Sequence, residues 1–139
     1  MRLSFIFACV FLAMPVSAAR QQLDTLTPAQ AISRAAKVSP KPVRAVFQLR
    51  VQSAKKSGSG YYLDSEKDYR SPANLGVAIR ASAMPGLMGK YGRDLDKAFV
   101  GKTIKLIGQV QRISVGNKSR AATATQVEVT HAGQILSVS

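Results

Sequence analysis

The stretch over residues 60–80 constrains the fold of this chain more than any other. Its two ends predict short strands, over residues 61–64 and 74–80, and a polar turn joins them. Apolar residues alternate along the second strand and give it one apolar face: Leu75, Val77 and Ile79. The segments around this hairpin predict further strands, so the pattern favours a small β-barrel built onto it.

Three more strands follow from the same alternation of apolar and polar residues. They cover residues 43–53, 103–113 and 125–130. Residues 54–60 lie between the first of these and the hairpin, and predict a basic turn rich in Gly and Ser. Gly108 interrupts the long strand, which indicates a bulge or a sharp coil. After a turn at residues 131–134, residues 135–138 close the chain.

Helical signals are short and lie outside the strands. Thr27 and Pro28 suit the cap and first position of a helix that ends before Pro40. Residues 81–93 contain one Pro and three Gly and predict a loop. Residues 94–99 predict a single helical turn with Asp94 as its cap. We expect residues 20–26 to be a flexible tail.

Three strands, a helical segment and two further strands are the arrangement of an OB-fold. We therefore predict an all-β protein with minor helix, a five-stranded OB-fold Greek-key barrel over residues 43–139. A tail and a short N-terminal helix, residues 20–42, precede it. Closing the sheet into a barrel would remove exposed edges. An open sandwich would need about seven strands.

The first residues predict export. Arg2, a short apolar run and small residues up to Ala19 have the order of a secretory signal peptide, residues 1–19. The run is short for a permanent span, although an uncleaved anchor is the alternative. Cleavage would remove Cys9, the one cysteine, and would leave a chain without disulfides or thiol chemistry. We expect a periplasmic or secreted protein with no membrane span after cleavage.

The charge of the chain is strongly positive. Lys and Arg number 20 against 7 Asp and Glu, and removal of Arg2 with the signal peptide leaves +12. Such a balance favours anionic partners, namely nucleic acid, acidic polysaccharide or an anionic membrane surface. The alternative is that the charge only keeps an exported protein soluble.

Several segments resemble one family. Residues 61–79 are similar to an aromatic–Leu–Asn/Asp–Ser–Glu–x–Asp–aromatic–Arg segment of bacterial secreted OB-fold domains, with Asp64 where Asn is commoner. Residues 99–110 resemble the entry of that family into its fourth strand. Residues 27–31 resemble a helix that often precedes the barrel. These domains resemble the anticodon-binding-like OB-fold group, and the resemblance implies nucleic-acid binding.

An OB-fold binds ligands around its second and third strands, between the loops that join strands one and two and strands four and five. Basic residues in those loops and outward residues of the strands give a candidate ligand-binding set: Arg50, Lys55, Lys56, Tyr62, Arg80, Lys118 and Arg120. An exposed tyrosine beside arginines could stack a base and neutralise a phosphate. Alternatively, Tyr62 covers the barrel and the cations are only solvated.

The acidic residues of the turn favour a structural role in the turn over metal binding. Asp64, Glu66 and Asp68 have alternating spacing, but Ca²⁺ needs six or more oxygens and basic residues lie among them. We expect the acids to bond turn backbone and Arg70. His131 is the one histidine, so a zinc site or a catalytic triad has no partners. We predict no catalytic residue, metal or cofactor.

The sequence thus favours an exported, monomeric and non-enzymatic OB-fold module that binds nucleic acid or another linear polyanion. A protein-interaction or envelope-stress module, with an envelope protein as its partner, is the first alternative. A calcium-dependent nuclease is the second.

Overall fold

The computed structural model describes residues 22–115 and 122–139. The predicted signal peptide and the residues Lys118 and Arg120 lie outside this part of the chain. The strands are β1 (Thr25–Leu26), β2 (Val43–Arg50), β3 (Ser53–Ser57), β4 (Gly60–Asp64), β5 (Leu75–Ile79), β6 (Thr103–Val115), β7 (Ala122–Val129) and β8 (Ile135–Val138). The helices are α1 (Pro28–Val38), α2 (Met84–Tyr91) and α3 (Leu95–Phe99), with 3-10 turns at Ala81–Ala83 and Ala132–Gln134.

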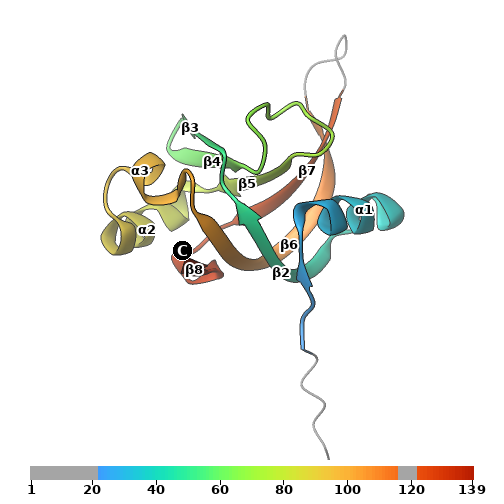
Figure 1. Cartoon of the computed structure of the whole chain (residues 1–139), viewed down its shortest axis with the longest axis horizontal. Helices are drawn as coiled ribbons and strands as arrows, with labels where there is room; N and C mark the ends of the chain where they lie inside the picture. The colour runs from blue at the N-terminus through green and yellow to red at the C-terminus, as the bar shows by residue number, and fades with distance from the viewer. Residues whose placement is uncertain (1–21, 116–121) are drawn as a thin grey trace, which may run out of the picture.

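All of these strands belong to one strongly curved sheet (Figure 1). Its order is β1-β2-β6-β7-β5-β4-β3, and β8 pairs with β6 beside this path. The pairs β1–β2 and β5–β7 are parallel and the others antiparallel. The described residues contain no helix that is long and apolar enough to cross a membrane.

The strands β2 and β3 lie near opposite ends of the path, yet they follow each other in the chain with only Val51 and Gln52 between them. Val51 exchanges backbone hydrogen bonds with Gly101 and Lys102, just before β6, at 2.8 and 2.9 Å. The N–H of Gln52 instead donates to the carbonyl of Asp64 in β4, at 2.9 Å. The chain therefore passes from the β6 side of the sheet to the β4 side between these two residues.

The mainly β, OB-like fold is confirmed, but the described part of the chain contains more strands than the five predicted. The sheet is open and holds eight strands, because β1 and β8 add two and residues 43–57 divide into β2 and β3. Residues 54–57 form most of β3 and not a turn, since their backbone pairs with β4. This edge strand carries exposed lysines in place of an apolar face, as edge strands often do, so alternation could not reveal it. The two residues of β1 are too few to show a period, and they replace part of the predicted flexible tail.

Two helices were predicted correctly and one was missed. Thr27 caps α1 and shares a capping box with Gln30, and Asp94 caps α3 by accepting from the N–H of Lys97. The prediction of a loop over residues 81–93 is wrong, because α2 occupies most of it. Pro85 lies in the first turn of α2, where a missing N–H costs nothing. Apolar residues at helical spacing then turn that helix inward: Met84, Leu87, Met88 and Tyr91.

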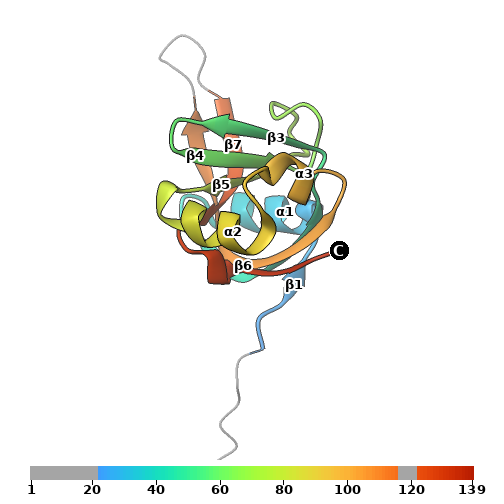
Figure 2. The ribbon, with the colours of Figure 1, turned by 90° about the vertical axis from the view of Figure 1, so that its left-hand side faces the viewer.

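The core fills the space that the curved sheet encloses. Phe47, Leu63, Val77, Leu106 and Val127 come from five different strands and are fully buried. The helix α1 adds the buried alanines of its inner face, while α2 and α3 lie at another side of the sheet (Figures 1 and 2). The strand residues that alternate with these core residues point away from the core and form the outer face of the sheet.

The strands β6 and β7 separate at one end, and a buried side chain fills the gap. Their ladder stops at Val110 and Val127. Beyond it the amide of Gln134 donates to the carbonyls of Ile107 and Glu128, both at 3.0 Å, and accepts from the N–H of Thr130 at 2.7 Å. Gln134 is only 8% exposed, so these bonds satisfy backbone groups that water reaches poorly.

Gly108 has a different role from the predicted bulge. It stays in register with Ala45 of β2, and the irregularity of β6 lies between Lys105 and Leu106, opposite β8. A Cβ atom at Gly108 would lie 2.9 Å from Cγ1 of Val127 and 3.2 Å from Nε2 of Gln134. The glycine is therefore needed for close approach of its neighbours and not for a break in the strand.

Alanine at two glycines should change stability in opposite directions. Gly108→Ala is expected to lower the free energy of unfolding by about 1–3 kcal/mol, because the methyl group overlaps Val127 and displaces Gln134. Gly89→Ala, in α2, meets nothing within 4 Å and should raise it by about 0.5–1 kcal/mol through helix propensity. Urea denaturation of both variants measures the difference. Equal midpoints for the two variants would contradict the close packing at Gly108.

Candidate functional site

The strand register brings some of the predicted binding residues to one outer face. Lys55 of β3 lies opposite Tyr62 of β4, and Tyr62 lies opposite Ala78 of β5. Ala78 in turn lies opposite Glu128 of β7. Side chains alternate along strands and Leu63 is buried in the core, so this row points outward. Ala78 is nevertheless only 1% exposed, which shows that larger neighbours cover it.

Arg80 joins this row just after β5. Its Nε donates to Oε1 of Glu128 at 2.8 Å, and the N–H of Arg80 donates to the carbonyl of Val129. The hydrogen-bonded carboxylate of Glu128 raises the pKa of Arg80 above its ordinary value, and nearby Tyr62 contributes to the shift. Both side chains of the ion pair are about half exposed, so the pair is in contact with solvent.

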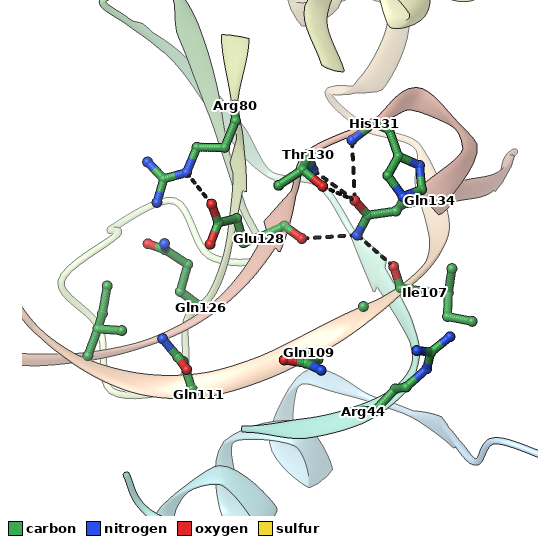
Figure 3. A pocket seen from close by; sticks show the side chains of 12 residues that line it. Arg44, Arg80, Ile107, Gln109, Gln111, Gln126, Glu128, Thr130, His131 and Gln134 are labelled. Carbon is green, nitrogen blue, oxygen red and sulfur yellow. Dashed lines mark hydrogen bonds and ion pairs between the residues drawn. The ribbon is translucent and has the colours of Figure 1, made fainter. Parts of the chain in front are cut away.

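An open cleft of about 440 Å³ continues this face across β7, β6 and β2. Arg80 and Glu128 form one wall, and Arg44 lies on the opposite side (Figure 3). Three glutamines from β6 and β7 lie between them: Gln109, Gln111 and Gln126. Gln134 and the diverging strands form the deeper end of the cleft.

Sequence reasoning missed Arg44 and the three glutamines of this cleft. A signal was present, because Arg44 alternates with buried Ala45 and Phe47, and Gln111 and Gln126 flank buried Val110 and Val127. What the sequence lacked was the pairing of the strands. Arg44 lies opposite Gln109 and Gln111 opposite Gln126 only because β2 and β7 both pair with β6.

Other predicted binding residues lie elsewhere. Arg50 is six positions from Arg44 on β2, about 20 Å away along the strand, and borders a separate shallow cleft with Lys67 and Val100. Lys56 lies opposite Tyr61 and points to the other side of β3 from Lys55. The structure thus brings together Lys55, Tyr62 and Arg80. Lys118 and Arg120 lie outside the described residues.

The acidic segment between β4 and β5 forms a hydrogen-bonded turn, as predicted. Asp68 accepts from the backbone N–H of Arg70 at 2.9 Å and from its Nε at 3.2 Å. Asn74 joins the two ends of the turn, since Nδ2 donates to Asp64 and Oδ1 accepts from the N–H of Glu66. In the part of the chain that the structure describes, no three His, Cys, Asp or Glu residues are placed to hold a metal ion.

A side-chain hydrogen bond near the surface joins β4 to α3 on the other side of the same strand. The hydroxyl of Tyr61 donates to the carboxylate of Asp96. Burial raises the pKa of Tyr61 to about 12, and the hydrogen bond to Asp96 adds to the shift. This contact holds the helix against the hairpin and leaves Tyr62, the next residue, on the outer face.

Comparison with known proteins supports the fold. No protein-family model and no curated protein matches the chain. Aspartyl-tRNA synthetase from Entamoeba histolytica is similar in structure, with a TM-score of 0.50 and 10% sequence identity, over 85% of this chain and 23% of that chain. At that identity the similarity concerns the fold alone.

Two further structures are less similar. A putative aspartyl-tRNA synthetase from Leishmania major Friedlin has a TM-score of 0.47 and 11% identity, over 85% of this chain and 22% of that one. The small single-stranded DNA-binding protein from Streptomyces coelicolor has a TM-score of 0.34 and 9% identity, over 73% of this chain and 94% of that one. The chain therefore spans less than a quarter of the length of either synthetase.

Two carboxyl groups of the turn should affect stability with opposite dependence on pH. Burial raises the pKa of Asp64, although hydrogen bonds from Asn74 and Ser53 oppose the shift. The stability that Asp64 contributes is therefore complete below the ordinary aspartate pKa and is lost as the pH rises through the raised value. Asp64→Asn does not titrate, so it should gain stability relative to the parent protein as the pH rises above about 4.

Asp68 is the matched control for this prediction. Hydrogen bonds from the backbone and side chain of Arg70 lower its pKa, so its contribution is present above the ordinary aspartate pKa and lost as the pH falls. Asp68→Asn should therefore lose stability relative to the parent protein over the same rise in pH. Chemical denaturation midpoints between pH 3 and pH 7 test both, and parallel curves for the two variants would refute the assignment.

Proposed function

We propose that this protein is an exported, monomeric OB-fold module that binds nucleic acid or another linear polyanion and has no enzymatic activity. The observation that supports this most is the continuous outer face on which Lys55, Tyr62, Arg80 and Arg44 lie, with the open cleft among them. Tyr62 is half-buried, and cations beside a partly exposed ring and a groove are the usual components of a single-stranded nucleic-acid site.

We further propose that β2 and β3 act as one bent strand. The register and backbone hydrogen bonds support this, because the chain changes pairing partner between Val51 and Gln52 without leaving the sheet. On this view β2 with β3, β4, β5, β6 and β7 form the five-stranded barrel of an OB-fold, and β1 and β8 extend it. The proposed site then covers the outer side of all five strands, with Arg44 and Lys55 on the first of them.

The positions of the acidic residues favour an anionic ligand at this face. The whole chain has 7 acidic residues, and Glu128 is the one that lines the cleft. Its charge is offset by Arg80. Asp24 and Asp68 pair with arginines elsewhere, and Asp96 faces Tyr61. Arg44 and Lys55 therefore give this face an excess of positive charge.

Binding should depend steeply on salt. Neutralisation of phosphates by these cations releases counterions, so the logarithm of affinity for single-stranded DNA or RNA should fall linearly with the logarithm of salt concentration. For about three contacts the slope is about −2. Fluorescence anisotropy with labelled DNA, RNA and heparin measures it. Absence of binding at low salt would refute the proposal and favour a protein partner from the envelope. Cleavage of the oligonucleotide on addition of calcium would refute the absence of enzymatic activity.

Charge-matched variants test the position of the site. Arg44→Gln with Lys55→Gln removes two cations of the proposed face, whereas Arg50→Gln with Lys56→Gln removes two that lie off it. The first double variant should bind at least about tenfold more weakly at low salt and reduce the salt slope by about 1 or more. The second should lose much less affinity, although both have the same net charge. Equal losses would show that only net charge matters.

A pair of tyrosines tests the contribution of stacking. Tyr62→Ala should weaken binding of single-stranded DNA by about 1–3 kcal/mol, because it removes the ring of the proposed face. Tyr69, which is 65% exposed in the turn between β4 and β5, gives the control variant Tyr69→Ala. Both variants are first compared with the parent protein by urea denaturation. Unchanged affinity in the folded Tyr62→Ala variant would exclude a stacking role.

A further inference from the structure

The floor of the cleft differs chemically from its margins. Arg44 and Arg80 lie on opposite sides, while the floor between them carries the primary amides of Gln109, Gln111 and Gln126 (Figure 3). Gln109 and Gln111 are two residues apart on β6 and so lie on the same face, about 7 Å apart. Gln111 and Gln126 are direct partners across β6 and β7. Three neutral amides therefore form one compact group.

These amides are available to a ligand. The hydrogen bonds drawn inside the cleft belong to Arg80, Glu128, Thr130, His131, Ile107 and Gln134, and none joins Gln109, Gln111 or Gln126 to another residue shown there (Figure 3). Gln109 and Gln111 are exposed and Gln126 is half-buried. Gln134 provides a contrast in the same cleft, since its amide is fully used by backbone groups.

A primary amide carries both donors and an acceptor, whereas phosphate oxygens only accept. Phosphates are better matched by arginine, which occupies the margins of the cleft. The edge of a nucleobase presents donors and acceptors side by side, and glutamine pairs with adenine in a bidentate manner through N6 and N7. The described residues that line this cleft include no Phe, Tyr or Trp, and its floor carries amides, so hydrogen bonding is favoured over aromatic stacking there.

We propose that the glutamine floor reads base edges, so that the protein binds single-stranded nucleic acid selectively and prefers adenine. This proposal rests on the proposed function and adds sequence preference to it. The bases would lie with their edges against Gln111 and Gln126, and the backbone would follow Arg44 and Arg80. Tyr62 lies outside the cleft and would stack a neighbouring base without selecting it.

The test compares twelve-residue single strands of dA, dT and 7-deaza-dA at one fixed low salt concentration. The dA strand should bind about tenfold more tightly than the dT strand, as one bidentate pair predicts. The 7-deaza strand lacks the N7 acceptor but can still stack, and it should bind like dT. Gln111→Met and Gln126→Met remove the amides at similar size, and each should reduce the preference for dA while the affinity for dT stays the same.

Gln48→Met is the matched control, because Gln48 is an exposed glutamine on β2 that does not line the cleft. It should keep the full preference. Equal affinity for dA and dT would overturn the base-reading proposal and leave nucleic-acid binding intact. A preference that 7-deaza-dA retains, or that both methionine variants retain, would also overturn it. Failure of every strand to bind would overturn this proposal together with the proposed function.

Discussion

The amide of Gln134 holds together the part of the sheet where β6 and β7 diverge. β6 and β7 diverge beyond Val110 and Val127, and two backbone carbonyls would otherwise face each other across the gap without donors. Gln134 donates to both, from Ile107 and Glu128, and accepts from the backbone after β7. A buried unsatisfied carbonyl costs about 1–3 kcal/mol, so one side chain replaces the missing rungs of the ladder. Gly108 gives it the space to do so.

The same divergence creates the candidate binding surface. Where two strands separate, the outer face of a sheet is hollowed, and the cleft lies there between Arg44 and Arg80. Its position on paired strands, with Gln111 opposite Gln126, holds the polar side chains at spacings that the backbone determines. Sites on strands are held more rigidly than sites on loops. The stability of this part of the sheet and the geometry of the proposed site thus depend on the same few residues.

Some features of the fold could be predicted from local sequence because local interactions produce them. The capping box at Thr27, the cap at Asp94 and the pairing of Asp68 with Arg70 involve residues at most three positions apart. Other predictions were wrong, and the physical reasons are equally clear. Glycines and a proline predicted a loop where α2 forms, since contacts of its apolar face with the core outweigh its weak helix propensity. The edge strand β3 forms through its partner β4, and its own residues carry no apolar pattern.

By itself, the sequence determined the mainly β, OB-like order of strands and the positions of α1 and α3. The reason is that strand alternation and helix caps depend on residues only a few positions apart. It also indicated Tyr62 and Arg80 as outward residues of neighbouring strands, with Lys55 in a basic loop beside them. Only the tertiary structure decided that Arg44 and three glutamines join that face, and that Arg50 and Lys56 do not. The reason is that β2 is distant in sequence from β6 and β7, and the register of these strands depends on how the core packs and where Gln134 bonds the diverging backbones.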